Sequence, residues 1–240
     1  MTSQHSSAYA TTRGSTARAV AAGVRRIRAA GADPAAAPAA AGRLPRDLRG
    51  RARHPRSLVF AAGDLVVLSG LPGSGKSTLI RRAAPGRGVD SQDTRDRWDA
   101  RAPAFLPYAL YRPLVRLAHY AGLRRALRSG ESVVVHDCGT QAWVRRWLAR
   151  EARRRGTALH LVLLDVPPEL ARRGQRERGR GVSGYAFARH RRGVGRLITQ
   201  VETGRPPQGC ASAVLLDRDA ATALTLLGFE HDFEPGRPAH

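Results

Sequence analysis

The sequence has almost no lysine, few aromatic residues and little cysteine. Of its 41 lysine and arginine residues only Lys76 is a lysine, and Phe, Trp and Tyr make up 5% of the 240 residues. With so few aromatics, the sequence shows no obvious base-stacking platform of the kind that single-strand nucleic-acid binders use. Cys138 and Cys210 show neither metal-ligand nor C-x-x-C spacing, so we expect a reduced, intracellular protein without a zinc site.

Long apolar runs are also missing. None approaches the ~20 residues that a membrane-spanning helix needs, and the N-terminus lacks the apolar core of a secretory signal. We therefore expect a cytoplasmic protein with no membrane partner. The net charge of +22 would favour nucleic acid or phosphorylated substrates. Because almost all of that charge is arginine in a chain rich in Ala and Gly, a coding bias explains it equally well.

Composition divides the chain into three parts. Residues 1–56 are mainly Ala, Arg, Gly, Ser and Thr, which predicts a mostly disordered extension with one short helix over 17–30. Its arginines could bind nucleic acid, and a solvated extension without a partner is the alternative. Residues 57–230 are expected to form one domain and 231–240 a tail. We expect a monomer.

One stretch carries a complete phosphate-binding motif. An apolar strand is predicted at 65–68, and G-x-x-x-x-G-K-[ST] and a helix follow it. Glycines let successive N–H groups point into one concavity, and the helix N-terminus adds its positive end. An ordinary glycine-rich turn is the alternative. The predicted phosphate loop comprises Gly70, Leu71, Pro72, Gly73, Ser74, Gly75, Lys76, Ser77 and Thr78.

Two side chains of this loop have specific chemical roles in the prediction. Lys76 would reach the β- and γ-phosphates, and the Ser77 hydroxyl would bind Mg²⁺. Lysine is a compact point charge on a flexible stem, and a planar guanidinium would not fit the same cradle of backbone amides. The single lysine therefore stands where the shape of the side chain matters as well as its charge.

Apolar runs of strand character alternate with helical segments between residues 58 and 227. This order predicts an α/β fold with a parallel sheet and helices on both faces, in which ligands bind at the carboxyl ends of the strands. Asp90, Asp137 and the phosphate loop all follow predicted strands, so we expect them to converge. The last helix is predicted over 220–227. The predicted strands are 58–60, 65–68, 88–90, 133–137, 159–164 and 214–217.

The two strand-end acids suit phosphoryl transfer. Asp137 would hold Mg²⁺ directly or through water, or else cap the following helix. Asp90 is the candidate general base that accepts the proton of an attacking hydroxyl, and Asp93 competes for this role. Asp93, Arg95 and Arg97 could hold the acceptor substrate, and exposed ion pairing among these residues is the alternative.

A second basic segment follows the predicted strand 159–164 and its helix. Arginines and glycines between 172 and 180 could form a flap that closes over the triphosphate and stabilises charge on the transferred group. Arg176 and Arg180 are the predicted catalytic arginines, and a solvated basic run is the alternative. His136, His160 and His190 have no partner at ligand spacing and are interpreted as structural.

The phosphate loop, Asp90 with Arg95, the run Val-Val-Val-His-Asp137 and the segment near Arg176 together resemble small P-loop kinases. The nearest group is the "AAA-family ATPase" domain that is similar to zeta toxins and polynucleotide 5′-kinases, and the resemblance spans roughly 58–227. It implies a three-layer α/β/α P-loop NTPase fold with a five-stranded parallel sheet of order 2-3-1-4-5. It also places the family's acid on Asp90, although relatives often carry another acid where this chain has Gln92.

The resemblance implies ATP with Mg²⁺ and transfer of the γ-phosphate to a hydroxyl acceptor. We therefore expect an ATP-dependent kinase that acts on a small molecule or a nucleic-acid end. The alternative is a regulatory nucleotide-binding ATPase with slow hydrolysis, whose basic N-terminal extension binds nucleic acid. ATP rather than GTP also comes from the resemblance, since the chain has no N/T-K-x-D guanine motif.

Overall fold

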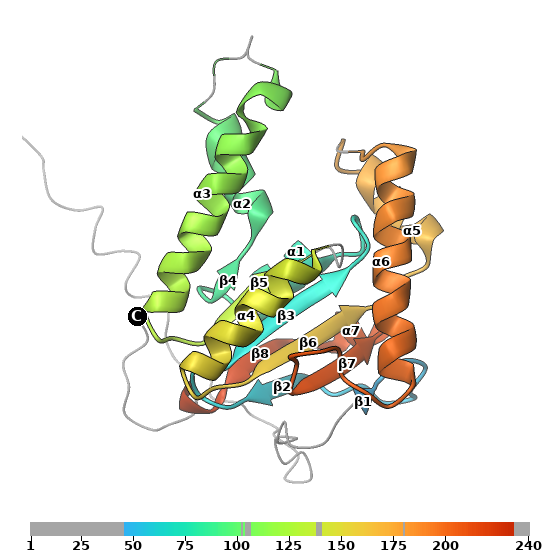
Figure 1. The fold of residues 1–240 in the computed structure, drawn as a ribbon. Helices are drawn as coiled ribbons and strands as arrows, with labels where there is room; N and C mark the ends of the chain where they lie inside the picture. Colours follow the sequence, from blue (N-terminus) through green and yellow to red (C-terminus); the bar gives the residue numbers. More distant parts are fainter. Residues whose placement is uncertain (1–45, 102, 104–106, 138–140, 180, 233–240) are drawn as a thin grey trace, which may run out of the picture. The chain divides into compact units, whose positions relative to one another are not determined.

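The computed structural model describes residues 46–101, 103, 107–137, 141–179 and 181–232. The helix predicted over 17–30 and most of the predicted tail therefore lie outside the described residues. Within them, strands and helices alternate along the chain, and a parallel sheet lies between two helical layers (Figure 1). The fold is thus the predicted three-layer α/β/α arrangement of P-loop proteins.

The main sheet has six strands in the order β1-β7-β6-β3-β5-β4, and each pair is parallel. Without β1, the order β7-β6-β3-β5-β4 confirms the predicted five-strand order. β3 lies at the centre and is buried along its whole length, because apolar side chains alternate to both faces of a covered parallel sheet. The strands are β1 (Arg46–Asp47), β3 (Leu65–Gly70), β4 (Gly88–Val89), β5 (Val133–His136), β6 (Leu159–Leu164) and β7 (Ser212–Leu216).

Two apolar clusters hold the layers together. One joins β3, β5, β6 and β7 to α1 and α7, and the other joins the opposite face of the sheet to α3, α4 and α6. A helix packs onto a sheet in this way because its apolar stripe must be buried. The helices are α1 (Lys76–Ala83), α2 (Ser91–Asp99), α3 (Tyr108–Arg128), α4 (Ala142–Arg154), α5 (Pro168–Arg176), α6 (Gly184–Glu202) and α7 (Arg218–Ala223).

The sixth strand corrects the expected boundary at residue 56. β1 pairs with the outer edge of β7, and the next residue, Leu48, is 1% exposed within the core. Arg49 then forms ion pairs with Asp165 at 2.6 Å and Glu202 at 2.8 Å. Residues 46–56 therefore belong to the folded domain. The sequence did not predict this because backbone pairing and one buried leucine hold β1 in place, and neither produces an apolar run.

We expect Leu48→Ala to destabilise the domain by about 2–5 kcal/mol, the usual cost of truncating a buried leucine. Urea unfolding followed by circular dichroism measures this change. Leu110→Ala is the matched control, because Leu110 is 67% exposed, and its effect should stay within about 0.5 kcal/mol. Equal unfolding midpoints for the two variants would show that residue 48 does not belong to the core.

The end of the domain also differs from the prediction. The helix expected over 220–227 stops at Ala223, and Leu226–Phe229 instead form strand β8, which pairs in parallel with β2 (Ser57–Phe60). β2 therefore belongs to a second, two-stranded sheet rather than to the main one. A short 3₁₀ turn, Glu230–Asp232, follows. The two strands bury Phe60 and Phe229 against the α1 face.

A buried serine, histidine and aspartate lie at the amino ends of the central strands. His160 contacts Ser212 Oγ at 2.6 Å and Asp64 Oδ2 at 2.9 Å, and all three side chains are buried. Asp64 also accepts hydrogen bonds from the backbone N–H groups of Ala61 and Ala158. These hydrogen bonds join β6 to β7 and to the turns around Asp64. The three residues lie at the end of the sheet opposite the phosphate loop, so they agree with the structural interpretation of His160.

Candidate functional site

The phosphate loop connects the carboxyl end of β3 to the first turn of α1. Three of its glycines, Gly70, Gly73 and Gly75, have φ angles of 155°, 90° and 96°. Residues with a side chain rarely adopt these angles, so the glycines allow the loop to turn sharply between a strand and a helix. The Ser74 N–H donates to the Leu71 carbonyl at 3.0 Å and closes the turn.

The start of α1 is suited to an anion. Gly75 is the N-cap and supplies no side-chain hydrogen bond, and the first turn contains no acid. The first N–H groups of a helix have no partner inside the helix, and the helix dipole adds positive potential there. The buried Ser74 hydroxyl also has no hydrogen-bond partner among the described residues. An uncapped helix end and an unsatisfied hydroxyl both match the oxygen atoms of a phosphate.

Lys76 is 3% exposed, and its ammonium group lies inside the loop. It donates hydrogen bonds to the carbonyls of Gly70 at 2.9 Å and Leu71 at 2.8 Å. The loop's own carbonyls thus hold the charge in place beside the helix N-terminus. Of the two hydroxyl residues that follow, Ser77 is buried and Thr78 is exposed.

Helix α5 packs directly on the phosphate loop. A Cβ atom at Gly73 would lie 2.0 Å from the Ala171 carbonyl oxygen, and one at Gly174 would lie 2.7 Å from the Gly73 carbonyl oxygen. No side chain fits at such distances. Glycine is therefore required on both sides of this contact, and α5 forms a wall of the phosphate loop.

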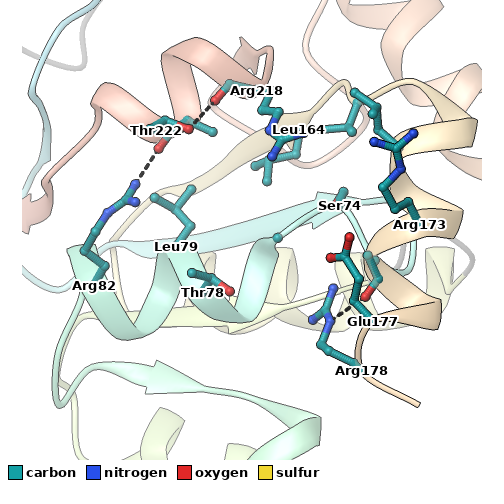
Figure 2. Close-up of a pocket in the computed structure, with 16 residues that line it drawn as sticks. Ser74, Thr78, Leu79, Arg82, Leu164, Arg173, Glu177, Arg178, Arg218 and Thr222 are labelled. Atoms are coloured by element: carbon teal, nitrogen blue, oxygen red, sulfur yellow. Dashed lines mark hydrogen bonds between the residues drawn. The ribbon is translucent and has the colours of Figure 1, made fainter. Parts of the chain in front are cut away.

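A cavity of about 420 Å³ adjoins the loop between α1, α5, α7 and the end of β6 (Figure 2). Its apolar part includes Leu164, Val166 and Leu170, and four arginines and one carboxylate supply its charge. Arg82 is tied to α7 through the carbonyls of Ala221 and Leu224. The charged residues that line the cavity are Arg82, Arg173, Glu177, Arg178 and Arg218.

The basic segment after β6 lies only partly where the sequence predicted it. Arg176 ends α5 with an exposed side chain, and Arg180 lies outside the described residues. The arginines that line the cavity from this segment are instead Arg173 and Arg178. Arg178 also donates to the Gly174 carbonyl at 2.8 Å. The sequence prediction missed both, because the rotation of α5 places Arg173 and the turn after α5 places Arg178.

Asp90 is buried directly after β4, and its carboxylate meets His136 at the end of β5. Asp90 Oδ1 lies 3.1 Å from His136 Nδ1, and Ser91 Oγ lies 3.3 Å from the same nitrogen. Burial and then the nearby charge of Lys76 lower the pKa of His136, whereas Asp90 opposes the shift. A neutral His136 therefore donates its Nδ1–H to the carboxylate. No spacing in the sequence signals this contact, and the structural interpretation of His136 stays a prediction.

The acidic and basic residues after Asp90 form helix α2, which the sequence did not predict. Asp93 lies on the exposed side of this helix. The partial burial of its carboxyl group and then the charge of Asp90 raise the pKa of Asp93. Arg95 contacts Asp99 at 3.3 Å, and Arg97 donates to the Asp93 carbonyl and to the Thr94 hydroxyl. Arg95 and Arg97 thus contact residues of their own helix, and Arg95 pairs with Asp99 rather than with Asp90 or Asp93.

Asp137 continues from β5 and is buried, and it pairs with Arg145 of α4 at 3.2 Å. Its backbone N–H donates to the Leu68 carbonyl, which fixes Asp137 beside the strand that leads into the phosphate loop. The described residues contain no group of three or more His, Cys, Asp and Glu side chains that could hold a metal. Ser77 and Asp137 are oxygen donors suited to Mg²⁺, which usually retains several waters and binds substrate phosphates.

A comparison against protein families matches the part of the chain that contains the phosphate loop. A family model described as an AAA domain matches residues 65–196, which is more than half of the chain. The chain belongs to this family. The match begins at β3 and ends within α6, so this AAA domain includes the phosphate loop, Asp90 and Asp137.

Several solved structures are similar to this AAA domain in fold. One, from the PezAT toxin–antitoxin system of Streptococcus pneumoniae, is 15% identical over 74% of this chain and 80% of its own, with a TM-score of 0.49. A gluconokinase from Sinorhizobium meliloti is 21% identical over 68% and 92%, with a TM-score of 0.38. The tunicamycin resistance protein of Deinococcus radiodurans is 17% identical over 68% and 98%, with a TM-score of 0.36. No curated protein matches the sequence.

Across the parts of the chain that the structure describes, no helix has both the length and the apolar character to cross a bilayer.

Proposed function

We propose that the protein is an ATP-dependent phosphotransferase that moves the γ-phosphate of ATP to a hydroxyl group of a small molecule or a nucleic-acid end. One observation carries this proposal. Strand β3, which leads into the phosphate loop, pairs with β5, and β5 pairs with β4. At the carboxyl end of these strands, His136 of β5 contacts Asp90 at 3.1 Å. The phosphate loop therefore borders a buried carboxylate, which simple nucleotide binding does not need.

Each group of the site has its own role in the proposed phosphate transfer. The loop amides, the α1 N-terminus and Lys76 bind the phosphates and stabilise negative charge on the transferred group. The oxygen of the acceptor hydroxyl attacks the γ-phosphorus, and Asp90 accepts the proton that this hydroxyl loses. The new O–P bond forms as the bond between the γ-phosphorus and the β,γ-bridging oxygen breaks, and ADP leaves.

The cavity beside the loop suits the nucleoside part of ATP. Its apolar residues Leu164, Val166 and Leu170 offer contact to a base, and Arg173 and Arg218 can stack on it or bind phosphate oxygens. Ser77 and Asp137 would hold Mg²⁺. When bound, the ion neutralises phosphate charge and fixes the phosphate geometry.

Transfer of label from [γ-³²P]ATP to a panel of hydroxyl compounds tests the proposal. The panel contains hexoses, nucleosides and an oligonucleotide with a 5′-hydroxyl, and mass spectrometry identifies the product. We expect at least one compound to raise ATP turnover and to gain one phosphate. Turnover that no acceptor changes, with free phosphate as the only product, would instead favour the regulatory ATPase with slow hydrolysis.

A further inference from the structure

Three rings lie in a row between α3 and α4. The rings of His119 and Tyr120 have centroids 5.4 Å apart, and those of Tyr120 and Trp143 lie 5.1 Å apart. Trp143 lies in the first turn of α4, and it is 47% exposed. The outer end of this aromatic row thus offers a flat apolar surface to solvent, in a chain with few aromatic residues.

The inner end of the aromatic row lies beside the acids of the candidate site. Burial lowers the pKa of His119, and the charge of Asp90 opposes that shift. Burial raises the pKa of Tyr120, and the charge of Asp137 adds to the rise while Arg116 opposes it. The contacts place the same residues together: the Tyr120 hydroxyl donates to Gln141 at the start of α4, and Asp137 pairs with Arg145 of that helix. Val89, the residue before Asp90, packs against the same apolar cluster as Tyr120. The aromatic row therefore lies on the elements next to both acids, and its exposed end is Trp143.

One polar atom of the aromatic row is unsatisfied. His119 Nδ1 is buried and has no hydrogen-bond partner among the residues that the structure describes. The Tyr120 hydroxyl, by contrast, donates to Gln141. An unsatisfied buried nitrogen is costly, so His119 Nδ1 at the inner end of the aromatic row fits a ligand that supplies a polar group there.

We propose that the acceptor is a hydroxyl compound of the nucleoside kind, with a planar ring that stacks on Trp143 and Tyr120 and a hydroxyl that points towards His119 and Asp90. This inference rests on the proposed transfer and names the acceptor class for it. Stacking needs only the flat face of a ring and tolerates different bases. A compound without a planar ring loses this contact.

Equilibrium dialysis tests binding separately from chemistry. The full chain is saturated with a non-hydrolysable ATP analogue, so that the nucleotide site is filled, and is then dialysed against radiolabelled thymidine or glucose. We expect thymidine to bind more tightly than glucose. Trp143→Ala should weaken thymidine binding about tenfold, as loss of one stacking contact does, and Trp143→Phe should restore most of it. Leu117→Ala, which removes a 68% exposed side chain from α3, is the control and should bind as the unaltered chain.

Transfer to thymidine supplies a second measurement. Trp143→Ala should raise KM for thymidine about tenfold while kcat and ATP binding stay close to those of the unaltered chain, which a general loss of structure would not produce. Equal thymidine binding by Trp143→Ala and the unaltered chain, or tighter binding of glucose than thymidine, would overturn the inference. If glucose alone is phosphorylated, the inference fails and the transfer stands. Trp143-dependent binding without any phosphorylated product would contradict the transfer instead.

Discussion

Lys76→Met should reduce phosphate transfer by at least about 10²-fold, the usual effect of removing one group that stabilises transition-state charge. Lys76 is 3% exposed, and the carbonyls of Gly70 and Leu71 fix its ammonium group inside the loop. Methionine keeps the apolar stem but removes the charge and all three donors. Label transfer from [γ-³²P]ATP measures the loss, and calorimetry with ATP shows how much of it arises in binding.

Two further variants separate shape from charge. Lys76→Arg retains the positive charge, but a guanidinium is larger and planar and does not fit the cradle, so we expect a loss comparable to that of Lys76→Met. Arg81→Met removes one positive charge from an exposed position of the same helix, and its transfer rate should stay close to that of the unaltered chain. A folded Lys76→Met protein with the original rate would show that this loop is not the site of transfer.

The phosphate loop could be predicted from the sequence because its motif from Gly70 to Ser77 is contiguous. Apolar runs mark β3, β5, β6 and β7, but β4 is only Gly88–Val89, and the order of these five strands came from the resemblance to small P-loop kinases. The prediction that Asp90 and Asp137 lie at the carboxyl edge also follows from topology alone. Chain order and the right-handed crossover leave few alternatives for such a fold.

Other elements leave little trace in the sequence. β1 is only Arg46–Asp47 and is held by backbone pairing with β7, so it carries no apolar pattern. The apolar Leu226–Phe229 matches a helix end as well as a strand, and pairing with β2 decides between them. Helix α2 contains mostly charged residues, which were interpreted as a binding cluster. In each case a contact with a distant segment decides the structure.

The candidate site shows the same limit at the level of side chains. His136 was interpreted as structural because no partner lies at a recognisable spacing in the sequence, whereas its partner Asp90 lies on the neighbouring strand end. The arginine run after β6 is visible in the sequence. The rotation of α5 and the turn that follows it then decide that Arg173 and Arg178 line the cavity. Pairing across the sheet and helix rotation are long-range properties that composition and spacing do not encode.

Asp90→Asn should lower kcat by about 10²–10⁴-fold, the range that a general base contributes, while ATP binding is retained. The reason is chemical: asparagine is close to aspartate in size but cannot accept the acceptor's proton. Asp93→Asn is the matched control. Asp93 lies three residues further along and is exposed on α2, so this variant should keep most of kcat. Steady-state transfer rates with saturating ATP and acceptor measure both.

His136 should act on the same step through its contact with Asp90. The neutral ring donates its Nδ1–H to Asp90 Oδ1 across 3.1 Å, and this contact fixes the direction of the carboxylate. His136→Ala removes the donor and should lower kcat with little change in KM for ATP, whereas His136→Gln, which retains an N–H donor, should recover part of the rate. If Asp93→Asn abolishes transfer and Asp90→Asn does not, the base is Asp93, and the buried pair of Asp90 and His136 has a structural role only.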